Sequence, residues 1–332
     1  VHLAELLRVP VIAAWRRGDV ISNDHPLYLG MTGYGAPATV RERLERADAM
    51  LVIGCRLNEI TSYGWSIPGP STRWAHVDVA PDRPAPDLPA ATIRVESDAK
   101  LFLRAAVARL ERAGVLDAAS TDARVARNTA DRVAWEASTV IDGHPWAGPG
   151  IHPGRVVTTL RSILPEDAIL TTDAGSFGSW VARGFRFRRP GTFLGPTSGA
   201  MGYGLPAAIA AGLVHRDRPV VAVVGDGGLG MTVAELETAV RHGLRTVVLC
   251  FDNEQYGMIR TYQDRRDEGS AAGTDLGPVD WASVARGFGA NGIRVDSDGA
   301  FGPALQKALL ADRPTVIHLV MDRRWTGVDA RP

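Results

Sequence analysis

The 332-residue sequence has no net charge, only two cysteines, few aromatic residues and no long hydrophobic run. Its 37 basic and 37 acidic side chains balance, whereas nucleic-acid-binding proteins usually carry a basic excess, so we expect no nucleic-acid partner. No apolar stretch reaches the roughly 20 residues that span a bilayer, so we expect no membrane partner. Cys55 and Cys250 lack a CxxC spacing and predict neither a disulfide framework nor a zinc site. With no recognisable signal peptide, we expect a globular cytoplasmic protein.

Short β-rich runs alternate with helical patterns along the whole chain. This alternation is typical of parallel strands joined by crossover helices. The predicted fold class is therefore α/β, with two doubly wound parallel-sheet domains. We expect the first domain at residues 1–113, a linker with a central helix at residues 114–150, and the second domain at residues 151–332.

The apolar runs and helical patterns also predict individual elements. In the first domain we expect strands over 10–14, 50–53, 74–79 and 92–95 and helices over 40–47 and 100–112. In the second domain we expect strands over 168–172, 220–224, 246–251 and 315–320. The helices expected there span 151–164, 202–214, 233–242, 281–288 and 301–311.

An acidic residue between glycines follows the apolar run 220–224, in the order Gly225-Asp226-Gly227. Ligands of open α/β sheets bind at the carboxyl ends of the strands. An aspartate there can bind a cation or a ribose, and the flanking glycines let a diphosphate approach the backbone. Taken alone, the same pattern also fits an ordinary strand-to-helix turn.

A second polar stretch follows the next apolar run and includes Asn253, which comes 27 positions after Asp226. One strand–helix–strand unit takes about 30 residues, so the two side chains are expected at the same edge of neighbouring or nearby parallel strands. Carboxylate and amide oxygens suit Mg²⁺ or Ca²⁺ rather than zinc. Because Mg²⁺ fills its remaining positions with phosphate oxygens and water, the pattern indicates a metal-bridged diphosphate.

These stretches together resemble the thiamine diphosphate (ThDP) enzymes of the acetolactate synthase-like family. The Gly225–Gly227 stretch followed by Asn253 resembles the family's cofactor-binding motif. Residues 195–208 resemble its cofactor-supporting loop and helix, residues 171–175 its other diphosphate-side turn, and residues 24–30 its central domain. The resemblance implies a central Rossmann-like domain, truncated at its start, followed by a ThDP diphosphate-binding domain. The family's N-terminal pyrimidine-binding domain is expected to lie elsewhere.

The resemblance also implies roles for individual residues. Mg²⁺ would be held by Asp226, the side chain of Asn253 and the backbone carbonyl of Gln255. Met201 would lie under the bend of the cofactor, and the carbonyl of Gly199 would accept a hydrogen bond from its aminopyrimidine. The remaining predicted cofactor-binding residues, several of which would offer an amide or a hydroxyl to the diphosphate, are Gly175, Ser176, Gly225, Gly227, Gly228, Tyr256, Gly257 and Met258.

The activity implied by the resemblance is that of a ThDP- and Mg²⁺-dependent transferase or lyase, which decarboxylates a 2-oxo acid and then performs carboligation. One alternative is a 2-oxo acid decarboxylase without carboligation, similar to benzoylformate decarboxylase; another is a non-catalytic ThDP-binding subunit. The family's activating glutamate resides in the pyrimidine-binding domain, so no catalytic residue is assigned. We therefore expect the chain alone to be inactive and to work as a homo-oligomer or with a partner chain carrying that domain.

Three departures from the family pattern bear on the substrate and on FAD. Tyr262 stands where acetohydroxyacid synthases carry a Trp associated with acceptor choice. Residues 56–61 replace the family's FAD-side stretch, and Phe177 replaces a His often found near the diphosphate. These changes argue against FAD binding and against branched-chain amino acid synthesis, and they leave ThDP and Mg²⁺ untouched.

Overall fold

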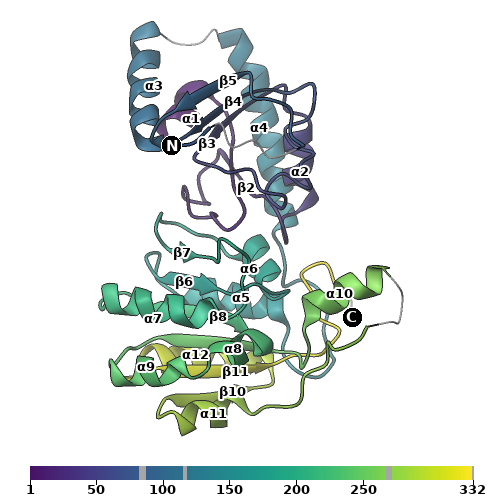
Figure 1. Ribbon diagram of the computed structural model, residues 1–332, viewed down its shortest axis with the longest axis vertical. Helices are drawn as coiled ribbons and strands as arrows, with labels where there is room; N and C mark the ends of the chain where they lie inside the picture. Colours follow the sequence, from purple (N-terminus) through teal and green to yellow (C-terminus); the bar gives the residue numbers. More distant parts are fainter. Residues whose placement is uncertain (82–86, 115–117, 267–270, 331–332) are drawn as a thin grey trace. The chain divides into compact units, whose positions relative to one another are not determined.

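The computed structural model describes residues 1–81, 87–114, 118–266 and 271–330 (Figure 1). The chain divides into two compact units, Val1–Thr139 (unit 1) and Val140–Pro332 (unit 2). Both contain parallel strands alternating with helices, which confirms the predicted α/β class with two parallel-sheet domains. Among the described helices, none combines the length and the apolar content that crossing a bilayer requires.

Unit 1 holds two small parallel sheets, one formed by β1 and β2 and the other in the order β3-β4-β5. Strand β2 was not predicted from the sequence. Its four residues are all buried, and it pairs with β1, which is only three residues long. The elements of unit 1 are α1 (His2–Leu7), β1 (Val11–Ala13), β2 (Tyr28–Met31), α2 (Ala38–Glu45), β3 (Ala49–Ile53), β4 (Arg73–Asp78), β5 (Ile93–Glu96), α3 (Ala99–Ala113) and α4 (Ala118–Ser138).

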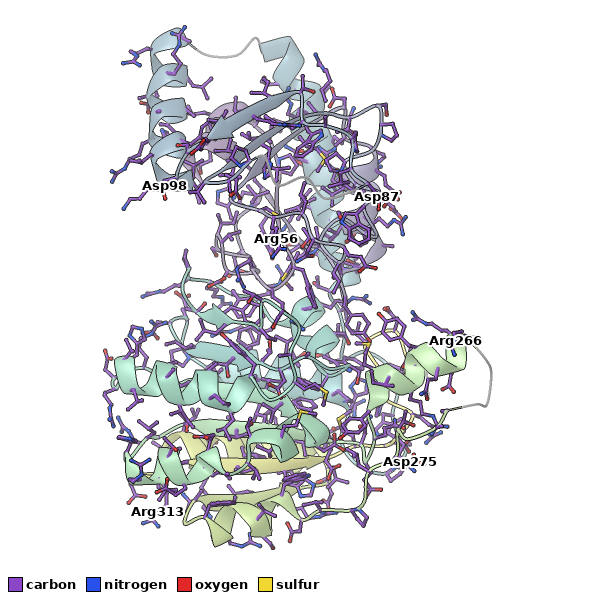
Figure 2. The ribbon with its side chains drawn as sticks, in the orientation of Figure 1. Arg56, Asp87, Asp98, Arg266, Asp275 and Arg313 are labelled. Atoms are coloured by element: carbon purple, nitrogen blue, oxygen red, sulfur yellow. The ribbon has the colours of Figure 1, made fainter. Side chains whose placement is uncertain are left out.

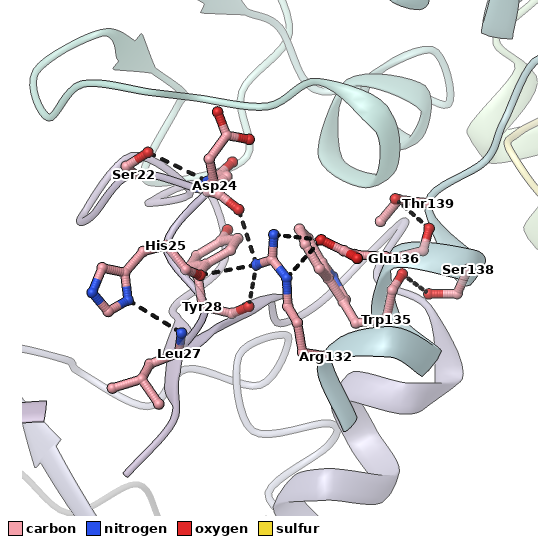
Figure 3. A network of polar contacts seen from close by, with 11 residues as sticks. Ser22, Asp24, His25, Leu27, Tyr28, Arg132, Trp135, Glu136, Ser138 and Thr139 are labelled. Carbon is pink, nitrogen blue, oxygen red and sulfur yellow. Dashed lines mark hydrogen bonds and ion pairs between the residues drawn. The ribbon is translucent and has the colours of Figure 1, made fainter. Parts of the chain in front are cut away.

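Helix α4 belongs to unit 1, although it lies in the stretch 114–150 that was expected to be a linker. It packs against α2 and β2. Its Arg132 is nearly buried and donates from Nη1 to the backbone carbonyls of Asn23, His25 and Tyr28 at 2.8–3.0 Å (Figure 3). A buried guanidinium is tolerated only when its donors are satisfied. These three acceptors therefore fix the helix to the loop that leads into β2.

Unit 2 is built on one parallel sheet with the strand order β10-β11-β9-β8-β6-β7. Every residue of the central strands β8 and β9 is buried. Continuous burial of this kind is expected for parallel strands that are covered by helices on both faces. The strands are β6 (Ile169–Thr172), β7 (Phe193–Leu194), β8 (Val220–Gly225), β9 (Val247–Asp252), β10 (Asn291–Val295) and β11 (Thr315–Val320).

Helices cover both faces of this sheet. On one face α7, α8, α9 and α11 contribute to a single buried cluster, which includes Leu205, Leu236 and Trp281. On the other face α5 packs against α12, and α12 packs against β10 and β11. Each fully buried leucine contributes roughly 1.5–3 kcal/mol to stability. The helices are α5 (Pro153–Ile163), α6 (Gly178–Gly184), α7 (Gly204–Val214), α8 (Asp226–Thr232), α9 (Glu235–Arg241), α10 (Gly257–Arg266), α11 (Trp281–Gly287) and α12 (Asp298–Leu309).

The sequence patterns did not predict every element of unit 2. Strand β7 has only two residues, and β10 includes Asn291, Gly292 and Arg294, which weaken the apolar signal of a strand. Helices α6, α8 and α10 were also missed. Each of these helices starts within a glycine-containing stretch, which by itself predicts a turn.

Candidate functional site

The carboxyl ends of β6, β8 and β9 meet at one edge of the unit 2 sheet. The parallel register pairs Thr172 with Val223 and Gly225 with Phe251, so these strands end nearly level. Ligands of doubly wound sheets bind at this kind of edge. The segments that leave the strands here are residues 173–177, 226–228 and 252–257, and they contain most of the predicted site residues.

The loop that precedes α7 is joined to the same edge. The backbone N–H of Ala174 donates to the carbonyl of Ala200 at 3.4 Å, and the N–H of Gly204 donates to Oδ1 of Asp173 at 2.5 Å. A Cβ atom at Gly228 would lie 2.1 Å from Oδ2 of the same carboxylate. Asp173 therefore lies between the starts of α7 and α8 and connects three of the stretches that carry the family resemblance: 171–175, 195–208 and the turn that contains Gly225–Gly227.

Gly199 and Met201 lie in this loop. Gly199 has a φ of +74°, a left-handed conformation that glycine adopts without strain, and its N–H donates to the carbonyl of Pro196 at 3.2 Å. Met201 is half-buried and precedes Gly202, which has a φ of +77°. The loop brings both residues to the strand edge, and their roles toward the cofactor stay predictions.

Asp226 begins α8 directly after β8 and is 5% exposed. Its Oδ1 accepts a hydrogen bond from the N–H of Gly227 at 2.8 Å. Among the described residues, its buried Oδ2 has no hydrogen-bond partner. Burial, reinforced by the neighbouring Asp252 carboxyl, raises the pKa of Asp226 to about 7. A buried carboxylate oxygen without a donor is a suitable ligand for a hard cation.

Asp252 and His318 are part of this edge, and neither was predicted from the sequence. His318 Nε2 lies 2.7 Å from Asp252 Oδ2, and both side chains are buried. Although burial alone raises the pKa of Asp252, the hydrogen bond from His318 and the interaction with Asp226 lower it overall. A polar His in the otherwise apolar run of β11 was the available sequence signal.

Negative charge is concentrated around Cys250, which lies in β9. Burial raises the pKa of the Cys250 thiol well above its ordinary value, and the carboxylates of Asp226, Asp252 and Asp173 raise it further. In the described parts of the chain, no group of three or more His, Cys, Asp or Glu side chains is arranged to hold a metal ion. A cation at this edge would therefore depend on Asp226 together with amide and carbonyl oxygens, as Mg²⁺ sites commonly do.

The side chains of Asn253 and Gln255 are held by the segment that follows β11. Asn253 Nδ2 donates to the carbonyl of Trp325 at 3.5 Å, and Gln255 Nε2 donates to the carbonyl of Arg323 at 2.5 Å. The backbone carbonyl of Gln255, the predicted metal ligand, accepts from the N–H of Gly257 at 2.9 Å. A carbonyl has a second lone pair, so this contact leaves Gln255 able to bind a cation.

Ser176 is brought to the start of α10. A Cβ atom built at Gly257 would lie 3.1 Å from Ser176 Oγ and 3.3 Å from Asn253 Nδ2. Met258 follows in the first turn of the same helix and is half-buried. The structure therefore gathers a hydroxyl, an amide side chain and a helix start within a few ångströms, which is the donor set that a phosphate group requires.

Packing explains several glycines that were predicted to contact the diphosphate. A Cβ atom at Gly175 or at Gly225 would come within 3 Å of the Phe177 ring, at 2.3 and 2.9 Å respectively. A Cβ atom at Gly227 would lie 2.5 Å from the ring of Tyr256. The two aromatic rings leave no space for a side chain at these positions, so glycine is required there by the protein's own packing as well.

Two family models match the chain. The model described as "Thiamine pyrophosphate enzyme, central domain" matches residues 1–106. The model described as "Thiamine pyrophosphate enzyme, C-terminal TPP binding domain" matches residues 173–319, which include the segments 173–177, 226–228 and 252–257 at the strand edge. The chain belongs to the thiamine pyrophosphate enzymes. The family resemblance seen in the sequence motifs is thereby confirmed.

Curated relatives of this family align with the chain, two of them over nearly its whole length. A sulfoacetaldehyde acetyltransferase of Castellaniella defragrans is 31% identical over 98% of this chain and 58% of the relative. A probable acetolactate synthase large subunit of Methanococcus aeolicus is 26% identical over 96% of this chain and 55% of the relative. A catabolic acetolactate synthase of Raoultella terrigena is 37% identical over 52% of this chain and 31% of the relative. The chain thus spans little more than half the length of the first two relatives.

Proposed function

We propose that unit 2 of this thiamine pyrophosphate enzyme binds the diphosphate of ThDP through a Mg²⁺ ion at the strand edge. The observation that carries the proposal is the buried Oδ2 of Asp226, which lacks a hydrogen-bond partner among the described residues. Asp226, the Asn253 side chain and the Gln255 carbonyl would hold the ion. Ser176 and the amides of the glycine turns would meet the diphosphate, because a phosphate needs several converging donors.

The proposed reaction is decarboxylation of a 2-oxo acid followed by carboligation. When bound, ThDP supplies the carbanion chemistry that this reaction requires. The chain's own part is to hold the cofactor: Asp226 and Asn253 balance the diphosphate charge through the ion, and Met201 supports the cofactor from the loop before α7. We expect the activating glutamate in the part of the relatives' length that this chain does not span, either on a longer chain or on a partner.

A second candidate reaction is acetyl transfer. It is favoured by the relative of Castellaniella defragrans, whose name is sulfoacetaldehyde acetyltransferase and which aligns with 98% of this chain at 31% identity. Both candidates use the same ThDP site in unit 2. They differ in the substrate that the enzyme consumes, so the strand edge supports either one equally.

Calorimetric titration tests the cofactor site. The chain should bind ThDP in the presence of Mg²⁺ and lose this binding when Mg²⁺ is chelated. The Asp226→Ala variant should bind ThDP at least about 100-fold more weakly, because loss of a supporting group alone already costs 10–100-fold in metal sites. Binding that is absent from the wild-type chain, or equal in the two proteins, would show the assignment to be wrong.

Substrate consumption separates the two reactions. The chain should be assayed with pyruvate and with sulfoacetaldehyde, alone and together with a protein that supplies a pyrimidine-binding domain. We expect acetolactate from pyruvate only in the combined sample. Consumption of sulfoacetaldehyde instead would favour acetyl transfer, and turnover by the chain alone would contradict the placement of the activating glutamate.

A further inference from the structure

The segment that follows β11, residues 321–329, runs along the candidate site; we refer to it as the brace. It begins where the N–H of Met321 donates to the carbonyl of Asp252 at 2.8 Å. It lies beyond residues 173–319, the range that the C-terminal family model matches. The resemblance therefore assigns no role to any residue of the brace.

The brace holds the loop 253–257 from one side. Besides the carbonyls of Arg323 and Trp325 that accept from Gln255 and Asn253, the Arg323 side chain itself reaches the loop. Its Nη2 donates to the carbonyl of Glu254 at 3.0 Å and to Oδ1 of Asp275 at 2.5 Å. Asp275 is labelled in Figure 2. The guanidinium of Arg323 thus connects Glu254, at the centre of the loop 253–257, with Asp275.

The loop needs such support because Glu254 has a φ of +53°. A left-handed conformation at a residue other than glycine costs of order 1–3 kcal/mol and persists only where the surroundings impose it. Glu254 is held by three contacts: its N–H donates to Asp252 Oδ1 at 3.1 Å, and its carbonyl accepts from Leu276 N–H at 2.9 Å and from Arg323. Removal of the Arg323 donor therefore weakens the restraint on a strained residue that lies between Asn253 and Gln255, two of the three predicted metal ligands.

The other end of the brace reaches the segment that contains Ser176, just after the diphosphate-side turn 171–175. The N–H of Val328 donates to Ser179 Oγ at 3.0 Å, and this hydroxyl donates to the carbonyl of Ser176 at 2.6 Å. Arg183 of α6 pairs with Asp329 at 2.6 Å. One short segment therefore touches both the loop that carries Asn253 and the turn that carries Ser176.

A buried aromatic residue fixes the brace to unit 2. Trp325 is 1% exposed. Its ring centroid lies 4.7 Å from that of His152, 5.0 Å from that of Trp146 and 5.5 Å from that of Trp180. A large aromatic side chain packed on several rings has little conformational freedom. Trp325 therefore gives the brace a fixed position from which Arg323 can restrain the loop.

We propose that the brace positions the ThDP and Mg²⁺ site, with Arg323 as a positioning residue that holds Glu254 and thereby the oxygens of Asn253 and Gln255. This inference rests on the proposed function, since it assigns a task at the same site. Arg323 is not one of the groups that would hold the ion. It acts through the loop backbone, so its loss should change the affinity of the site and leave the chemistry of the ligands unchanged.

The matched variants Arg323→Ala and Arg324→Ala test this role. Both remove one positive charge from adjacent, largely exposed side chains. Arg324 pairs with Asp322 within its own turn and lies 5.2 Å from the centroid of the Trp146 ring, and its side chain makes no hydrogen bond to the described residues of the loop 253–257. If charge alone mattered, removal of a cation near the site would strengthen Mg²⁺ binding. If Arg323 positions the loop, its removal should weaken Mg²⁺ binding. The sign of the effect therefore separates the two explanations.

The experiment uses the full chain and two measurements. Mg²⁺ titration by calorimetry with ThDP present should give a Kd raised about 10-fold in Arg323→Ala, the effect typical of a supporting residue, and unchanged in Arg324→Ala. Hydrogen exchange of the ligand-free chain should show faster exchange over residues 252–258 in Arg323→Ala only. Thermal midpoints of the two variants should be similar, because exposed ion pairs contribute little to stability.

The outcomes are distinct for the two proposals. A Kd and an exchange rate in Arg323→Ala that match those of Arg324→Ala would overturn the role of Arg323 and leave the proposed function standing. Absence of Mg²⁺-dependent ThDP binding by the wild-type chain would overturn the proposed function, and the positioning role with it. Weaker binding and faster exchange in Arg323→Ala alone would support both.

Discussion

His318 Nε2 lies 2.7 Å from Asp252 Oδ2, although the two residues are 66 positions apart in the sequence. Their strands, β11 and β9, are neighbours in the sheet, and both side chains are buried. The imidazole donor favours the charged form of Asp252, whose carboxyl in turn favours the protonated form of Asp226. The proposed metal ligand therefore lies beside a buried acid and a buried base that the cofactor motif does not include, and a cation bound there would replace the proton that Asp252 favours on Asp226.

Removal of the base should destabilise the fold. We expect His318→Phe to cost about 1–3 kcal/mol in the free energy of unfolding, because Oδ2 of the buried Asp252 carboxylate loses the donor that His318 provides. Urea denaturation measures this change. Adding Asp252→Asn should recover part of the loss, since a neutral amide is less costly to bury than a carboxylate. Equal stability of His318→Phe and the wild type would show that the His318–Asp252 pair makes no net contribution to the free energy of unfolding.

Asp226→Asn should separate binding from stability. The variant removes the carboxylate that the proposal assigns to Mg²⁺, so ThDP binding in the presence of Mg²⁺ should be lost. The ligand-free variant should be at least as stable as the wild type at pH 8, because one of two adjacent buried carboxyls has been made neutral. Calorimetry and urea denaturation check the two effects. Retained binding would count against the metal assignment, and a strong loss of stability would count against the electrostatic argument.

Gly228→Ala and Gly230→Ala form a matched pair within α8. A Cβ atom at Gly228 would lie 2.1 Å from Oδ2 of Asp173, whereas one at Gly230 would lie 3.4 Å from Trp281. We expect Gly228→Ala to cost about 1–3 kcal/mol through overpacking. Gly230→Ala should be neutral or stabilise by up to about 1 kcal/mol, since alanine is the better helix former. Similar unfolding midpoints in urea for the two variants would refute this explanation.

His152 should make the stability of unit 2 sensitive to acid. Its Nδ1 accepts from the N–H of Gly154 at 3.0 Å and so caps α5, which requires a neutral ring. Burial, reinforced by Arg155, lowers the pKa of His152 despite the opposing charge of Asp298. Since protonation is harder in the folded than in the unfolded state, this contribution is fully present above the ordinary value of about 6.5 and is lost as the pH falls through the folded pKa.

The check is urea denaturation at pH 7.5 and 5.5. His152→Asn should show a smaller loss of stability between the two pH values, because asparagine is a good N-cap that does not titrate. His242→Asn, at an exposed position, should behave as the wild type does. A pH dependence that is the same in all three proteins would show that protonation of His152 does not limit stability in acid.

The candidate site was predictable only where it lies in contiguous stretches. Asp226 and Asn253 each follow an apolar run, and this local pattern sufficed to place them at strand ends. The contacts that support them come from positions far along the chain, such as His318 and Arg323. No local periodicity reports these contacts, because they depend on β11 being placed between β9 and β10 and on the path of the chain after β11.

The sequence by itself determined the α/β class, most strands and helices of unit 2, and the motif that identifies the thiamine pyrophosphate enzymes, because hydrophobic periodicity and turn residues are local properties. Tertiary structure alone decided that α4 packs on unit 1, since the three carbonyls that accept from Arg132 lie more than 100 positions away. Tertiary structure also explains why Gly175, Gly225 and Gly227 are needed: the rings of Phe177 and Tyr256 occupy the space that a side chain would need. The physical reason is that these features depend on close packing between segments far apart in the chain, and local sequence patterns do not predict such packing.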